Sequence, residues 1–169
     1  MAVDRGWLDR DSQQRLVDAL FAASRHWDVE LHFNKGLAGA PAGAIAASRD
    51  TATNPAVLDA FALAIIAGGA GPAYPGIAGH EPNLTAAAKD AADVARSMGE
   101  LRKIVPVAAS YVSESNFFEP GWQQSYWGAN YPKLQAVKAK YDPEGLFFVH
   151  NGVGSEDWSA DGFTRVARK

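Results

Sequence analysis

The longest apolar stretch of this sequence covers residues 60–67, and two glycines, Gly68 and Gly69, follow it at once. It is far shorter than the ~20 residues that a membrane-spanning helix needs, so we expect no such helix here. A short apolar run that ends in glycine is typical of a buried β-strand. We therefore predict a strand over most of residues 58–67, and this strand requires partners from elsewhere in the chain.

A second strand is indicated at residues 29–35, where apolar and polar side chains alternate. Alternation places successive side chains on opposite faces of a sheet. The residues expected on the core face are Val29, Leu31 and Phe33, and those on the polar face are Glu30, His32 and Asn34. Three different hydrogen-bonding groups on one face suit a substrate cavity over the sheet. They suit a solvent-facing strand of an antiparallel sheet equally well.

The helices are predicted from periodicity and from residues that favour helix ends. We expect a helix over residues 12–25 with Asp11 as its cap, and a short one over residues 42–49. The strongest helix covers residues 84–105, between Asn83 and Pro106. A third strand is predicted at residues 107–113, and a last helix follows Asn130.

Charge and cysteine content exclude several classes of function. Sixteen basic and nineteen acidic side chains give a net charge of −3, so no strong field attracts nucleic acid or anionic lipid. The absence of cysteine excludes disulfides, thiolate metal sites and a thiol nucleophile. The four histidines do not have ligand spacing, and we expect no metal. The charged first eleven residues are not typical of a secretory signal, so we expect a cytoplasmic protein.

Aromatic residues are concentrated in the last third of the chain. Ten of them fall between residues 111 and 148. At this density they suit a flat, ring-bearing ligand or a large partner surface, although any one of them alone is better explained as core. The glycines at 68, 69 and 71 do not have the spacing of a dinucleotide-binding loop, and no nucleophile elbow of a serine hydrolase is present.

A family resemblance is carried by residues 126–147. An aromatic residue is followed by W-G-x-N-Y, then K-x-K-Y-D-P and L-F, and this run resembles the C-terminal signature of the berberine bridge enzyme-like flavoproteins. Residues 110–113 resemble an upstream Tyr-x-Asn strand of that family, with Ser113 where asparagine is usual. Residues 29–39 and those after them resemble part of its substrate domain. We therefore expect a substrate-domain-like unit at residues 1–110 and the C-terminal segment at residues 111–169.

The resemblance implies an FAD-linked oxidoreductase. In such enzymes a substrate gives hydride to the flavin and a proton to a side-chain base, and oxygen commonly reoxidises the flavin. The implied fold class is α+β, with a small antiparallel sheet, helices packed on one face of it, and an aromatic-rich C-terminal helical segment. One face of this sheet would cover the flavin and a small-molecule substrate.

The resemblance also suggests roles for individual residues. Tyr111 would face the cavity and act as the catalytic base. Asn130 and Tyr131 would lie at the cofactor, although Asn130 could instead cap its helix. The substrate cavity would include the polar face of the strand at residues 29–35, which carries Glu30, His32 and Asn34.

The sequence shows no segment that resembles the family's FAD-binding domain. We therefore expect FAD to be bound by a domain or subunit on another chain, and the isolated chain to be inactive. A fragment, a subunit of a split enzyme and a relic with a new role all remain open. The alternative function is a non-catalytic binding or assembly protein, in which an exposed apolar face associates with itself or with another protein.

Overall fold

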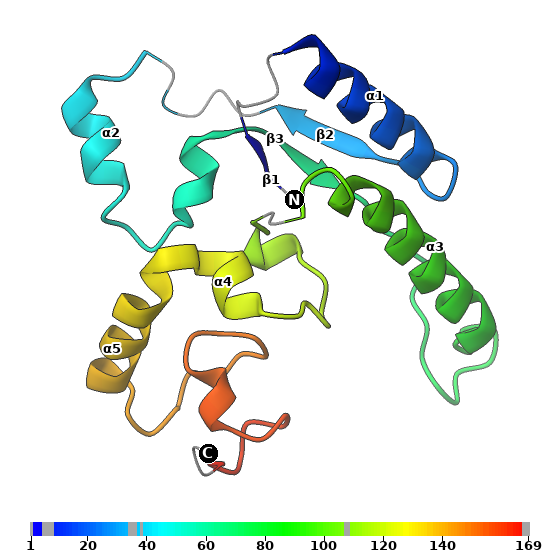
Figure 1. The fold of residues 1–169 in the computed structure, drawn as a ribbon. Coiled ribbons are helices and arrows are strands. Elements are labelled where there is room, and N and C mark those ends of the chain that lie inside the picture. The colour runs from blue at the N-terminus through cyan, green and yellow to red at the C-terminus, as the bar shows by residue number, and fades with distance from the viewer. Residues whose placement is uncertain (1, 5–8, 34–36, 38, 107–108, 167–169) are drawn as a thin grey trace. The chain divides into compact units, whose positions relative to one another are not determined.

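The computed structural model describes residues 2–4, 9–33, 37, 39–106 and 109–166 (Figure 1). The chain has an α+β fold, as predicted, and it divides into two compact units. Residues 3–34 and 61–108 form one, which we call the helix–sheet unit. Residues 1–2, 35–60 and 109–169 form the other, the C-terminal unit. The predicted boundary after residue 110 lies close to one junction of these units, but residues 35–60 belong with the C-terminal unit.

The sheet has the strand order β1-β3-β2, in which β1 is Ala2–Asp4, β2 is Glu30–Phe33 and β3 is Ala60–Ile65. Strands β2 and β3 are antiparallel, with Glu30 opposite Ile65 and His32 opposite Leu63. Both strands predicted from the sequence are therefore confirmed in their central residues.

Burial along β3 alternates, which shows that the sheet has one covered face and one open face. Ala60, Ala62 and Ala64 are buried, whereas the residues between them are only partly buried. Apolar composition alone had suggested a strand buried throughout. Phe33 was expected in the core, but it is 74% exposed. It lies at the end of β2, which is an edge strand, and its ring stacks on Phe61 with centroids 6.4 Å apart.

The helices of the helix–sheet unit, α1 (Arg10–Ser24) and α3 (Leu84–Arg102), pack against each other. Small side chains form this contact: Ala19 and Ala23 of α1 are buried, and the Ser97 hydroxyl of α3 donates a hydrogen bond to the Ala23 carbonyl (2.9 Å). The row of α3 that faces inward is Asp93, Ser97 and Leu101.

Side-chain oxygens cap both helices. The amide of Ser12 donates to Asp9 (2.9 Å), so the cap of α1 is Asp9 and not Asp11. The amide of Ala86 donates to Asn83 (2.9 Å), which confirms the predicted start of α3. A hydrogen bond from the Trp27 indole to the Ala67 carbonyl (2.9 Å) then fixes the end of β3 against the turn after α1.

The C-terminal unit consists of short helices around an aromatic cluster. Its α-helices are α2 (Ala42–Ser48), α4 (Trp122–Trp127) and α5 (Tyr131–Tyr141), and its 3-10 turns are η1 (Pro55–Leu58), η2 (Val112–Glu114), η3 (Gly128–Asn130) and η4 (Ser155–Asp157). Rings of α4 and α5 lie 5.5–6.5 Å apart between centroids: Trp122, Tyr126, Trp127 and Tyr131.

The strand predicted at residues 107–113 is wrong over its described part. Residues 109–111 are irregular, and the turn η2 follows them. The backbone amide of Ser110 donates to the Ser125 carbonyl of α4 (2.9 Å), a single bond that starts no strand ladder. The β-branched and aromatic side chains of this segment favour a strand, but the partner that it finds is the backbone of a helix.

Candidate functional site

A carboxylate and an imidazole meet on the open face of the sheet. Side chains directly opposite each other on paired strands lie on the same face, so Glu30 and His32 share a face with Ile65 and Leu63. The Nε2 atom of His32 lies 2.5 Å from Oε1 of Glu30, and both side chains are exposed. The shared face predicted for Glu30 and His32 is confirmed, while Asn34 lies outside the described residues.

Tyr111 belongs to the other unit, and it precedes the turn η2 instead of lying in a strand. Its side chain is 51% exposed, and its hydroxyl has no hydrogen-bond partner among the residues that the structure describes. An exposed hydroxyl without a partner is available to a ligand, so the catalytic role of Tyr111 stays a prediction.

Asn130 fastens a loop that is distant in sequence. Its amide group donates to the carbonyls of Thr51 (2.9 Å) and Thr53 (2.8 Å), and no hydrogen bond from it caps α5. An ion pair between Lys133 and Asp50 supports the same loop. Both donors of the Asn130 amide are thus used inside the chain, while its Oδ1 atom has no partner among the described residues.

Tyr131 is held by the segment that follows α5. Its hydroxyl donates to the Glu156 carboxylate (2.5 and 2.7 Å to the two oxygens) and accepts from the amide of Gly154 (3.2 Å). Gln135 donates to the same carboxylate (2.9 Å). Burial and the hydrogen bond to Glu156 raise the pKa of Tyr131 above its ordinary value. The hydroxyl therefore stays protonated and serves an internal contact.

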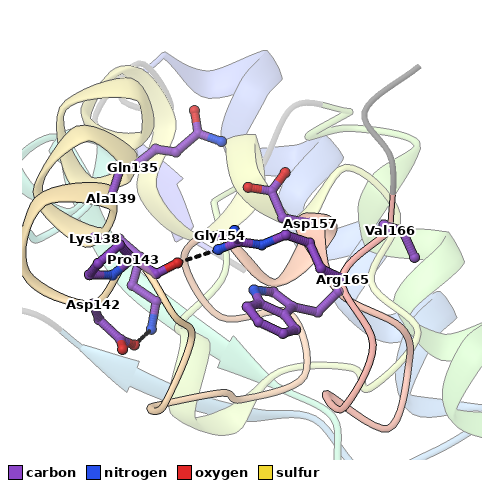
Figure 2. Close-up of a pocket in the computed structure, with 10 residues that line it drawn as sticks. Gln135, Lys138, Ala139, Asp142, Pro143, Gly154, Asp157, Arg165 and Val166 are labelled. Carbon is purple, nitrogen blue, oxygen red and sulfur yellow. Dashed lines mark hydrogen bonds and ion pairs between the residues drawn. The ribbon is translucent and has the colours of Figure 1, made fainter.

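A pocket of about 680 Å³ lies in the C-terminal unit, beside α5 and the tail (Figure 2). Two residues that line the pocket, Lys138 and Asp142, form an ion pair, and Lys138 also donates a hydrogen bond to the Phe147 carbonyl (2.7 Å). The Arg165 guanidinium stacks on the Trp158 ring, 5.0 Å from its centroid, and donates to the Pro143 carbonyl. Both cations, Lys138 and Arg165, already have partners within the chain. Their contacts hold the tail against α5, so neither side chain is free to pair with an anionic ligand.

The sequence analysis did not predict this pocket. The spacing of Lys138 and Asp142, four residues apart on one helix, is a signal that could have found their ion pair. No local pattern brings Arg165 to the turn at Pro143. The hydrogen bond from Lys138 lowers the pKa of Asp142, and backbone amides of Leu146 and Phe147 also donate to this carboxylate (2.8 and 3.0 Å).

Two apolar segments of the C-terminal unit are exposed, residues 117–118 and 146–149, and we call them the apolar segments. Phe118 is 80% and Phe147 75% exposed. The His150 ring stacks on Phe117 with centroids 4.0 Å apart, and both His150 and Asn151 contact the Phe117 carbonyl. The aromatic density of the sequence had suggested a flat ligand or a large partner surface, and a partner for the exposed side chains stays a prediction.

Two further classes of site were searched for in the described part of the chain. No group of three or more histidine or acidic side chains there is arranged to hold a metal ion. None of the described helices combines the length and the apolar character needed to cross a bilayer.

Comparison with known proteins finds a family likeness within the C-terminal unit. Residues 110–154 match the family described as berberine and berberine-like. An FAD-linked oxidoreductase of Arthroderma benhamiae is 46% identical over 66 residues, which cover 39% of this chain and 11% of that protein. The FAD-linked oxidoreductase ZEB1 of Gibberella zeae is 47% identical over 62 residues, or 37% of this chain and 11% of that one.

The fold is matched over nearly the whole chain. The crystal structure of the VAO-type flavoprotein MtVAO615 from Myceliophthora thermophila has a TM-score of 0.71 and 26% identity, covering 95% of this chain and 28% of that one. The chain thus spans only a small part of the length of its relatives. It is related to the C-terminal part of the FAD-linked oxidoreductases, and its likeness to the berberine-like family lies at residues 110–154.

Proposed function

We propose that this chain is the substrate-covering and C-terminal part of an FAD-linked oxidoreductase, which works with an FAD-binding part on a separate chain. The match of residues 110–154 to the berberine-like family carries this proposal. The likeness of fold to MtVAO615, which extends over both units, supports it. In this proposal, hydride passes from a small-molecule substrate to the flavin, and oxygen takes up the electrons.

The described residues offer a partial fit to a flavin. Oδ1 of Asn130 is free to accept a hydrogen bond from a ring N–H, as flavin possesses, while the amide group of Asn130 keeps its loop in place. The Tyr131 hydroxyl would first have to give up Glu156. Of the two predicted cofactor contacts, Asn130 is therefore the better supported.

The flavin, when bound, would supply the hydride acceptor. This chain would supply binding and proton transfer. The open face of the sheet offers the aliphatic side chains Leu63 and Ile65 beside the polar pair Glu30 and His32. An apolar body with one polar group suits such a face. Tyr111, with its exposed hydroxyl, is the candidate base that the family resemblance suggests, and His32 on the sheet is a second candidate.

A second candidate function is favoured by the apolar segments. Their exposed side chains would suit association with another protein or with a second copy of this chain, without catalysis. The two candidates differ in one respect that can be measured, because only the first requires bound flavin.

The experiment joins this chain to the flavin-binding part of a relative. The 28% of MtVAO615 that corresponds to this chain is replaced by residues 1–169. We expect a folded chimaera that retains flavin through gel filtration and consumes oxygen with a substrate alcohol or amine. A folded chimaera without flavin would contradict the proposal and favour the non-catalytic candidate.

A further inference from the structure

The open face of the sheet carries one exposed titratable pair beside aliphatic side chains. Of the residues of β2 and β3, Glu30 and His32 are the only ones with ionisable side chains. The residues of β3 that share their face are Leu63 and Ile65, which carry no charge. The imidazole of His32 therefore has a single charged neighbour on these strands, the carboxylate of Glu30.

The contact between these two side chains decides which imidazole nitrogen is free. An ionised carboxylate can only accept hydrogen bonds, so Nε2 of His32 must carry the proton that it shares with Glu30 at 2.5 Å. In neutral imidazole the other nitrogen then holds a lone pair. Nδ1 of His32 has no partner among the described residues, and it is thus ready to accept a proton.

We propose that Glu30 and His32 form an acid–base dyad for a predominantly apolar alcohol, an inference that rests on the proposed function. His32 is the catalytic residue, and Glu30 is the positioning residue that holds its tautomer. The Nδ1 atom accepts the hydroxyl proton as the O–H bond breaks. The adjacent C–H hydrogen would leave with both electrons as the carbon–oxygen double bond forms. A bound flavin would supply the acceptor for this hydride, so that the alcohol would be oxidised to a carbonyl compound.

The substrate class follows from the composition of the face. Leu63 and Ile65 favour an apolar body, and the dyad needs an O–H donor beside it. An anionic substrate is disfavoured, because the carboxylate of Glu30 lies on the same face and would repel it. Benzyl alcohol is a suitable probe, and benzyl methyl ether, which lacks the O–H group, is its matched control.

The first arm of the test measures flavin reduction in the chimaera by anaerobic stopped-flow. His32→Gln should lower the reduction rate with benzyl alcohol by about 10²–10⁴-fold and remove the fall in rate at low pH. Glu30→Gln should lower the reduction rate by at least about tenfold, while Glu30→Asp, which keeps the carboxylate, should lower it less. His26→Gln, an exposed histidine of the same unit, should change nothing. The ether should not reduce the flavin.

The second arm needs no flavin and uses the 169-residue chain labelled with ¹⁵N in histidine. Its spectra should place the proton of neutral His32 on Nε2, and Glu30→Ala should give a mixture of tautomers. The signals are assigned with His32→Gln. A proton on Nδ1 in the unaltered chain would overturn the dyad whether or not the chimaera is active.

The outcomes separate the two proposals. A folded chimaera that binds no flavin contradicts the proposed function. A flavin-loaded chimaera that benzyl alcohol does not reduce overturns the substrate class. The dyad is overturned if His32→Gln leaves the rate of flavin reduction unchanged while Tyr111→Phe lowers it strongly. Tyr111 would then be the base.

Discussion

The two units of this chain are stabilised in different ways. In the helix–sheet unit, small side chains allow α1 and α3 to approach, and the alanines of β3 fill the covered face of the sheet. In the C-terminal unit, particular side chains hold distant backbone groups, as Asn130 does at Thr51 and Thr53. Many sequences can satisfy the first kind of contact, whereas the second requires one residue type at one position.

This difference gives a physical reason for where the family likeness falls. The match to the berberine-like family lies at residues 110–154, inside the C-terminal unit. The fold likeness to MtVAO615 covers 95% of the chain and therefore includes both units. The comparison predicts that single substitutions at signature positions of the C-terminal unit are more damaging than those in the helix–sheet unit.

The largest effect is expected from Gly145→Ala. A Cβ atom at this position would overlap the Trp158 ring, and its backbone φ of +67° is unfavourable for any other residue. Overpacking and backbone strain together should cost about 2–4 kcal/mol of unfolding free energy. Urea denaturation measures the change. Gly43→Ala in α2, where nothing lies within 4 Å, is the control and should be neutral or slightly stabilising.

The next largest effect is expected from Asn130→Ala. It removes both hydrogen bonds to the Thr51 and Thr53 carbonyls and should cost about 1–3 kcal/mol. Asn130→Asp, which keeps the shape but has no donors, should be equally damaging. If denaturation showed the aspartate variant to be as stable as the unaltered chain, the loop would be held by something else.

A smaller effect is expected in the helix–sheet unit from Ser97→Ala. The Ser97 side chain is fully buried between the helices, and the change removes only its bond to the Ala23 carbonyl. We expect a loss of about 1 kcal/mol in thermal or urea denaturation. A loss larger than that of Asn130→Ala would reverse the comparison between the two units.

The smallest effects should come from charge and depend on pH. Hydrogen bonds from Lys89 and Arg96 lower the pKa of Asp93, as the bond from Lys138 lowers that of Asp142. A lowered pKa stabilises the folded state above the unfolded pKa, and this stability is lost as pH falls through the folded pKa. The melting temperatures of Asp93→Asn and Asp142→Asn should therefore approach that of the unaltered chain below about pH 4. A difference that is undiminished between about pH 7 and about pH 2 would show that the charge is not responsible.

The sequence predicts the regular elements better than their contacts. Alternation located β2, and an apolar run before two glycines located β3. Asn83 marked the start of α3, because its side chain accepts a hydrogen bond from the amide of Ala86 in the first turn. These signals are local, so they can be read from a few neighbouring residues.

The failures involve partners that are distant in sequence. The segment at residues 109–113 has strand-like side chains, but Ser110 bonds to the backbone of α4. Asn130 looked like a helix cap, but it makes no such bond, and its amide donates instead to the carbonyl of Thr51, 79 residues away. The pairing of Glu30 with Ile65 depends on strand register, which the alternation alone does not determine. The sequence thus indicates candidate site residues, but it does not indicate which distant residues they contact in the fold.

The most direct test of the account mixes two purified chains. One is this 169-residue chain, and the other is MtVAO615 without the corresponding 28%. The account predicts that flavin elutes from gel filtration in a complex with both chains in equal amounts, and that the 169-residue chain alone is colourless. Separate elution of the two chains, or stoichiometric flavin on the 169-residue chain alone, would contradict it.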